Sequence, residues 1–341
     1  MKLPRTGYAG PTVAIIGAGA TRGASFVPLS SQIFPPLDSD FFTQAQRLRG
    51  GEPSQLMQSL VGSAVRIFGR NFRLTMEGFL TQIEYLANIF DDYKQRGRPA
   101  KNPYKEVREE FLQVLATLLH ESIGSAPACD YHASLINMLE GRDTILSFNY
   151  DCTIDHNLRL GGSRKWNART GYGYPCYAKT ATKWNPGTPA REDRTLLLLK
   201  LHGSLNWAPF GGESDGPDRL RLKERWWRQH GDARFEIVPP EWNKVQIRQG
   251  VYKEIWRKAR HRVANCNCMM FVGYSLPATD LPAQALFRVD AWKAKSLKLL
   301  VIANPDREAR RRIREVVRRR LNEETRVLTF DSFKEVCEFW G

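Results

Sequence analysis

Short apolar runs recur along the chain, and most of them lead into a glycine-rich or polar turn. The runs that we expect to be buried strands are Thr12–Ile16, Thr144–Phe148, Thr195–Leu201, Cys268–Val272, Lys298–Ile302 and Val327–Phe330. Strands that are apolar on both faces are typical of a parallel sheet covered by helices. A shorter strand is expected at Phe235–Val238, before a Pro-Pro turn.

The residues between the first two strands follow a helical period instead. Phe111, Val114, Leu115 and Leu118, for example, recur on one face of a helix. The helices expected here are Leu56–Phe68, Met76–Arg96, Pro103–Ser122 and Tyr131–Leu139. Because this block is too long to be a simple crossover, we expect residues 41–142 to form an inserted helical subdomain.

The later strands alternate with helices such as Val251–Ala264. The sequence therefore predicts an α/β fold: a Rossmann-like parallel sheet with helices on both faces, formed by residues 1–40 and 143–341. Within this domain, residues 158–194 and 211–232 show little periodicity, and we expect them to be irregular insertions.

The chain carries 51 Lys and Arg against 36 Asp and Glu, a formal net charge of +15. Such an excess of positive charge attracts anions. One interpretation is direct contact with nucleic acid. The other is an ordinary solvated surface together with acidic partner subunits. The densest run, Arg307–Arg320, contains Ile313, Val316 and Val317 at helical spacing. We therefore expect a helix that packs on the fold with its arginines outward.

No apolar run is long enough to span a bilayer, and the first residues lack the pattern of a signal peptide. We therefore expect a cytoplasmic protein without membrane contact. The cysteines show no CxxC spacing, so we expect reduced, mostly buried thiols and no metal site. They are Cys129, Cys152, Cys176, Cys266, Cys268 and Cys337.

Several of the expected strands end in turns suited to a nucleotide, and the carboxyl ends of parallel strands form the usual ligand crevice. The turn Gly17–Ser25 lets the backbone approach a diphosphate and offers Arg22 as a bidentate partner. Its GxGxxxG spacing is one residue longer than the dehydrogenase motif. A tight turn without a ligand is therefore the alternative.

The other turns also have two interpretations each. Asn149 and Asp151 can face one pocket, or they can form an Asx turn that caps the next helix. His202 ends a buried strand, where it can act as a general base or be structural. The turns Gly273–Ser275 and Asn304–Pro305 leave room for a nucleoside, or they are ordinary turns without a ligand.

Taken together and in this order, these segments resemble the sirtuin family. The family's glycine turn, Thr-Gln-Asn-Ile-Asp segment, catalytic His-Gly and Gly-Thr-Ser turn correspond here to GAGATRGAS, SFNYD, HG and GYS. The longer segments LHGSLNW, VPPEWNK and GYSLPATD are similar to the bacterial sirtuin-like branch that acts in antiphage defence.

The resemblance implies roles for individual residues. Asn149 and Asp151 match the positions that hold the nicotinamide end of NAD, and His202 matches the catalytic base. The implied contacts to the rest of NAD are Gly17, Ala18, Gly19, Ala20, Arg22, Ser25, Gly273, Tyr274, Ser275 and Asn304.

One departure from the family changes the expected reaction. Deacetylase sirtuins carry a zinc ribbon of two CxxC pairs between the His-Gly and Gly-Thr-Ser segments, and this chain contains no CxxC. Attack by water is then the simpler chemistry. The resemblance therefore implies an NAD+ nucleosidase that needs no metal, releases nicotinamide and ADP-ribose, and aborts infection by depleting NAD.

The resemblance also implies control by self-assembly into a homo-oligomer, or by a separately encoded partner such as an ATPase or an Argonaute-type protein. Two alternatives stay open. One is an NAD-dependent deacylase or ADP-ribosyltransferase that uses the same pocket. The other is a non-catalytic module that binds nucleic acid or a partner protein, for which binding would survive His202→Ala.

Overall fold

A computed structural model describes residues 11–28, 30–92, 101–124, 128–162, 165–177, 196–209, 220–223, 236–237, 250–288 and 294–340. The chain forms two compact units, one of residues 1–28, 126–238 and 245–341, and one of residues 29–125 and 239–244. The expected subdomain, 41–142, included helix α6 (Asp130–Met138). In the structure α6 packs against α7 (Thr153–Leu160) and α11 (Phe333–Trp340) of the first unit. The main segment of the helical unit, residues 29–125, therefore begins and ends earlier than the predicted range 41–142.

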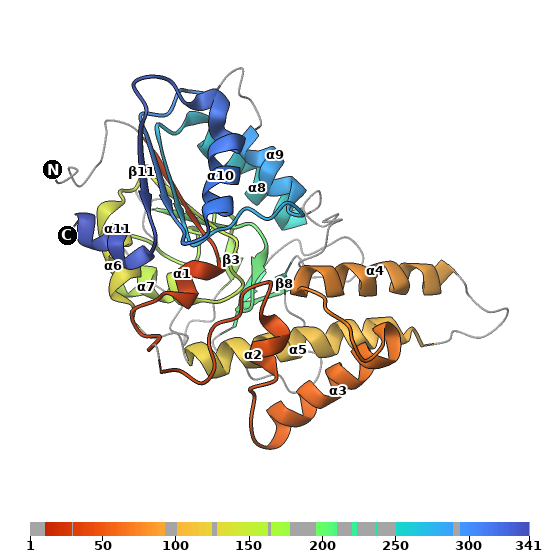
Figure 1. The fold of residues 1–341 in the computed structure, drawn as a ribbon. Coiled ribbons are helices and arrows are strands. Elements are labelled where there is room, and N and C mark those ends of the chain that lie inside the picture. Colours follow the sequence, from red (N-terminus) through yellow and green to blue (C-terminus); the bar gives the residue numbers. More distant parts are fainter. Residues whose placement is uncertain are drawn as a thin grey trace. The chain divides into compact units, whose positions relative to one another are not determined.

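The first unit is built on a six-stranded parallel sheet in the order β11-β10-β9-β1-β2-β4 (Figure 1). Its strands are β1 (Thr12–Ile16), β2 (Thr144–Ser147), β4 (Leu197–Lys200), β9 (Cys268–Val272), β10 (Leu299–Ala303) and β11 (Arg326–Phe330). Counted along the chain, this is the 3-2-1-4-5-6 order of a doubly wound Rossmann sheet. The predicted α/β, Rossmann-like fold is confirmed.

Burial explains why these segments are strands. Every residue of β2, β4, β9 and β10 is buried, as expected for strands covered on both faces. The helices α8 (Gly250–Asn265), α9 (Leu281–Arg288) and α10 (Arg307–Val317) lie on one side of the sheet, and α6, α7 and α11 lie on the other (Figure 1).

Among the described residues, the shorter strands form two small sheets that are separate from the main sheet. One group contains β3 (Cys176–Tyr177), β6 (Trp207–Pro209) and β7 (Leu220–Leu222). In addition, β5 (Gly203–Ser204) pairs antiparallel with β8 (Glu236–Ile237), so the strand expected at Phe235–Val238 lies outside the main sheet. Most of the two expected insertions, 158–194 and 211–232, lies outside the described residues.

The second unit contains the helices α2 (Phe41–Ala45), α3 (Gly51–Phe68), α4 (Met76–Asp92) and α5 (Pro103–Ile123). Its core includes the Phe111 ring, whose centroid lies 4.7 Å from that of Phe41 and 5.6 Å from that of Phe79. Asn102 caps α5 by accepting from Tyr104 N at 3.1 Å. Among the described helices, none combines the length and apolar character that crossing a membrane requires.

Candidate active site

The turns after β1 and β9 lie against each other at the centre of the sheet. Gly17 N donates to Val272 O at 3.1 Å, and Gly19 N donates to Gly273 O at 2.9 Å. A Cβ on Gly17 would lie 2.5 Å from Tyr274 Cα. A Cβ on Gly273, whose φ is +60°, would lie 2.1 Å from Ala20 N. The contact between the two turns therefore requires glycine, and it lies where the strand order reverses, at the usual ligand crevice of this fold.

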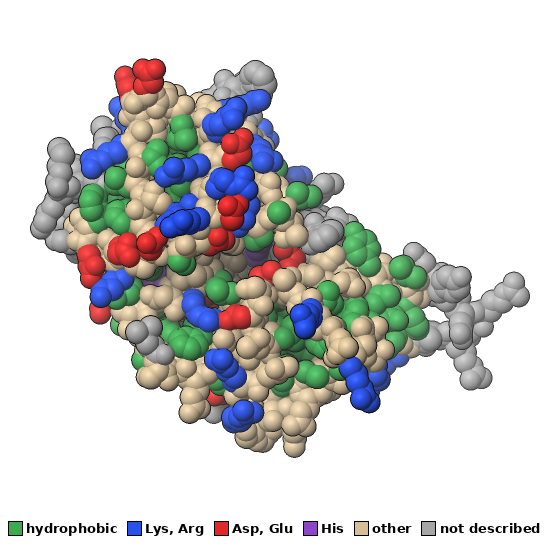
Figure 2. Space-filling model, viewed as in Figure 1, with side chains coloured by type: hydrophobic (Ala, Val, Ile, Leu, Met, Phe, Trp, Pro, Cys, Tyr) green, Lys and Arg blue, Asp and Glu red, His purple; other side chains and the backbone are tan. Residues whose placement is uncertain are grey.

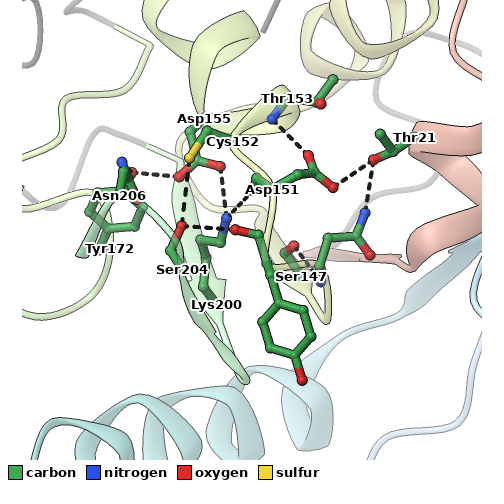
Figure 3. A network of polar contacts seen from close by, with 12 residues as sticks. Thr21, Ser147, Asp151, Cys152, Thr153, Asp155, Tyr172, Lys200, Ser204 and Asn206 are labelled. Carbon is green, nitrogen blue, oxygen red and sulfur yellow. Dashed lines mark hydrogen bonds and ion pairs between the residues drawn. The ribbon is translucent and has the colours of Figure 1, made fainter. Parts of the chain in front are cut away.

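Thr21 in helix α1 (Ala18–Arg22) connects this turn to Asn149 and Asp151. Asn149 Nδ2 donates to Gly17 O at 3.0 Å and to Thr21 Oγ1 at 3.1 Å. Thr21 Oγ1 donates to Asp151 Oδ2 at 2.9 Å (Figure 3). All three side chains are buried. The structure thus brings the first and second predicted turns together in one polar network.

The network fixes the orientation of the Asn149 amide. Because Nδ2 is held by two acceptors, Oδ1 is the atom left over, and it is buried without a hydrogen-bond partner among the described residues. Buried acceptors are rarely left unsatisfied in a folded protein. Asn149 Oδ1 is therefore suited to accept from a bound water or from a hydroxyl of a ligand.

Asp151 also makes the Asx turn that was the alternative interpretation of this segment. Its Oδ1 accepts from Thr153 N at 2.8 Å, at the start of α7. Both carboxylate oxygens therefore have partners, Thr21 on one side and Thr153 on the other. Asp151 is placed to hold the network in position, with its negative charge buried beside Asn149.

His202 follows β4 and is 7% exposed. Its Nε2 lies 3.5 Å from Asp280 Oδ2, and Tyr274 OH donates to the same oxygen at 2.8 Å. The His202 ring packs edge-on against Phe148, which stacks on Tyr274 with 4.1 Å between centroids. His202 therefore has a carboxylate beside it and joins the β9 turn through Asp280, Tyr274 and Phe148.

Sequence reasoning did not single out Asp280. The residue ends the GYSLPATD segment, and its backbone N–H donates to Pro277 O before α9 begins. The only signal for Asp280 in the sequence was an acidic residue next to the Gly273–Ser275 turn, which was already expected to bind the ligand. The sequence could not show that Asp280 lies near His202, because His202 belongs to another turn.

A buried ion pair lies next to the network (Figure 3). Lys200 Nζ is 3.0 Å from Asp155 Oδ2, both side chains are fully buried, and Nζ also donates to Asp151 O. Tyr172 OH donates to Asp155 Oδ1 at 2.5 Å. Burial alone would lower the Lys200 pKa, but the Asp155 carboxylate and nearby groups hold that pKa above its ordinary value. The sequence contains a signal for this ion pair: Lys200 directly follows four leucines in an expected buried strand. A buried ammonium needs a partner of opposite charge.

Of the remaining predicted residues, Asn304 contacts the turn after β9, whereas Ser25 contacts Cys129 and Asp130 at the start of α6. Asn304 Nδ2 donates to Tyr274 O at 3.2 Å, and its Oδ1 accepts from Asp306 N at 2.9 Å, so its amide shapes the turn before α10. Ser275 O accepts from Arg312 Nη2 at 3.1 Å. Arg22 is half-buried, whereas Ala18 and Ser25 are exposed.

All six cysteines are buried and none forms a disulfide. Cys129 Sγ lies 3.0 Å from His132 Nδ1 and 3.6 Å from Ser25 Oγ. Burial alone would raise the pKa of the Cys129 thiol, but the contact with His132 outweighs burial and lowers it to about 6. Within the described ranges, no group of three or more His, Cys, Asp and Glu side chains is arranged to hold a metal ion.

A comparison with protein-family models gave no match to this chain, and a comparison with curated protein sequences also gave none. The resemblance to sirtuins thus stays a prediction based on the sequence motifs.

Proposed function

We propose that this chain is a sirtuin-like NAD+ hydrolase that cleaves the nicotinamide–ribose bond. One observation carries the proposal: the glycine turn of β1 converges with the buried Asn149–Thr21–Asp151 network at the switch point of a Rossmann sheet. An Asx turn alone needs only the contact between Asp151 and Thr153. It does not need a neighbouring buried amide whose oxygen has no partner.

In the proposed reaction, the water oxygen bonds to the anomeric carbon of the ribose while the bond from that carbon to nicotinamide breaks. The electron pair of the broken bond leaves with the nicotinamide nitrogen and neutralises the pyridinium. The proton of the attacking water passes to His202 and then to solvent. The products are nicotinamide, ADP-ribose and one proton.

The residues have distinct proposed roles. Asn149 Oδ1 accepts from the attacking water or from a ribose hydroxyl, and Asp151 holds Thr21 and therefore Asn149 in place. Asp280 stabilises the imidazolium that forms when His202 takes up the proton. The turn Gly17–Ser25, with Arg22, binds the diphosphate, and the turns at Gly273–Ser275 and Asn304 bind the adenosine side.

The biological role proposed is that of a cytoplasmic antiphage effector that depletes NAD. Control would come from homo-oligomer assembly or from an ATPase or Argonaute-type partner. These parts rest on the motif resemblance, because a fold alone does not determine function. A deacylase or ADP-ribosyltransferase would use the same pocket and would differ in the group that attacks the ribose.

The decisive experiment measures nicotinamide release from NAD over a range of protein concentrations. We expect release by the unchanged protein and its loss in both Asn149→Ala and His202→Ala. Asn137→Ala and His261→Ala remove exposed residues of the same types and serve as matched controls. Calorimetric NAD binding is measured beside it, because a chain that needs an activator can bind NAD without hydrolysing it.

Three results would contradict the proposal or redirect it. Failure to bind NAD overturns it, and so does release that persists in both variants. Transfer of an acyl group or of ADP-ribose between NAD and a protein would favour the alternative enzyme.

A further inference from the structure

Helix α10 presents a row of arginines on its outer side. Arg307, Arg311 and Arg314 of α10 are exposed, as is Arg318 in the 3-10 turn that follows it, whereas the apolar residues of the helix are buried against the fold. Figure 2 shows Lys and Arg atoms gathered where Figure 1 places α10, with acidic atoms interspersed among them. The segment Arg307–Arg320 contains eight arginines and two glutamates, so the row is strongly positive.

These arginines line a groove of about 600 Å³ beside β11, the edge strand of the sheet. Its lining residues are Arg307, Arg310, Arg311, Arg314, Glu315, Arg318, Leu321 and Thr329. Arg314 Nη2 donates to the Thr329 hydroxyl at 2.9 Å. Because a hydroxyl is neutral, this contact does not compensate the charge of Arg314. The lining thus contains five arginines against one glutamate, so the groove carries a net positive charge.

Carboxylates near the groove compensate only part of this charge. Arg310, whose side chain is 18% exposed, pairs with Asp331. Arg311 pairs with Glu308 at 2.7 Å and Arg318 pairs with Glu315 at 3.8 Å, and the side chains of these last two pairs are all more than half exposed. Exposed ion pairs contribute little free energy and exchange readily with other anions. A polyanion can therefore replace these carboxylates at a small cost.

We propose that this groove binds the phosphodiester backbone of a nucleic acid strand. Every cation in the row is arginine, whose planar fork matches phosphate oxygens better than the point charge of lysine. Successive arginines along the helix are spaced by about one turn, roughly 5–6 Å, which presents donors at regular intervals to a linear polyanion. The site is separate from the proposed hydrolase site and does not depend on it.

The same surface does not fit an anionic membrane. A helix that lies on a membrane inserts exposed apolar side chains between the lipids. In α10 the apolar residues Ala309, Ile313, Val316 and Val317 are all buried. The exposed side of the helix offers charge without an inserting face, which favours nucleic acid over lipid.

The test measures binding of a fluorescein-labelled oligothymidylate by fluorescence anisotropy over a range of salt concentrations. Arg311→Glu with Arg314→Glu should weaken binding at least about tenfold at moderate salt. It should also reduce the slope of log K against log salt by about 1.4, since each lost contact to a single strand contributes about 0.7. The matched control is Arg257→Glu with Arg260→Glu, the same change in charge at exposed positions of α8.

The outcomes separate the possibilities. Binding that falls only in the groove variant supports the proposal, and a duplex probe then shows whether a single strand is preferred. Equal losses in both variants, or no binding of either probe, overturn it. Binding to phosphatidylserine vesicles in place of the oligonucleotide also overturns it. If the double variant does not fold, Arg318→Gln tests the same surface with a smaller expected loss of affinity.

Discussion

His202 Nε2 lies 3.5 Å from Asp280 Oδ2, although the two residues belong to turns after different strands. Both side chains are buried, and Tyr274 OH donates to the same carboxylate oxygen. A carboxylate beside a catalytic imidazole stabilises the charged form that proton uptake creates. Asp280 therefore extends the proposed site by one residue.

Asp280→Asn should slow nicotinamide release by about tenfold to a thousandfold, because the neutral amide no longer stabilises the imidazolium. NAD binding should change little. The measurement is kcat and KM for nicotinamide release, with Asp331→Asn at an exposed position as the control. An Asp280→Asn variant with unchanged kcat would remove Asp280 from the mechanism.

Thr21→Val keeps the shape of the side chain and removes its hydroxyl. Asp151 Oδ2 then loses its donor and Asn149 Nδ2 loses one acceptor. The free energy of unfolding should fall by about 1–3 kcal/mol, as for other unsatisfied buried groups, and nicotinamide release should fall with it. Thr21→Ser retains the hydroxyl and should retain both properties. Denaturant unfolding and the nicotinamide assay check this prediction, which fails if the valine and serine variants behave alike.

Lys200→Met should lower the free energy of unfolding by about 3–5 kcal/mol, because it leaves the Asp155 carboxylate buried without its cation. Lys200→Met combined with Asp155→Leu removes both charges and should recover part of that loss. Urea unfolding of the single and double variants measures the difference. A double variant that is less stable than the single one would show that packing, and not charge pairing, determines the effect.

Gly273→Ala should destabilise the fold strongly, because the added Cβ would meet Ala20 N at a backbone with positive φ. Gly162→Ala is the matched control: its φ is +88°, and an added Cβ meets nothing within 4 Å. The control should lose only about 1–2 kcal/mol for the left-handed backbone conformation. Thermal unfolding measures the stability of both variants. If both lose the same stability, the contact between the two turns contributes nothing to the stability of the fold.

Cys129 should be a thiolate at neutral pH, with a titration midpoint at about 6. Because the pKa is lowered in the folded state, the thiolate contributes most to stability above the ordinary value of 9.0. This contribution is lost as pH falls through about 6. Ultraviolet thiolate absorbance, measured against Cys129→Ser, checks the midpoint. His132→Ala should raise the midpoint to the ordinary value of 9.0 or above, because burial then acts without the imidazole, and an unmoved midpoint would contradict the role of His132.

The sheet could be predicted because its signal is local. Runs such as Val13–Ile16 and Cys268–Val272 are apolar throughout, and the structure buries them between two layers of helices. The boundary of the helical unit could not be predicted in the same way. The helical period of residues 131–139 does not reveal that this helix packs against α7 and α11.

The common edge of the candidate turns could be predicted, but the contacts that connect these turns could not. The order of motifs indicated that the turns at Gly17, Asn149, His202 and Gly273 share one edge of the sheet, and the strand order bears this out. The links between them depend on residues without a local pattern. Thr21 and Asp280 look like ordinary turn or helix residues, and only three-dimensional packing gives them their partners.

The contact between the turns at Gly17 and Gly273 has a consequence for synthesis. The glycine turn and Asn149 leave the ribosome long before β9, so a nascent chain holds one half of the crevice without the other. The crevice of the proposed hydrolase would therefore be complete only after translation has passed Gly273.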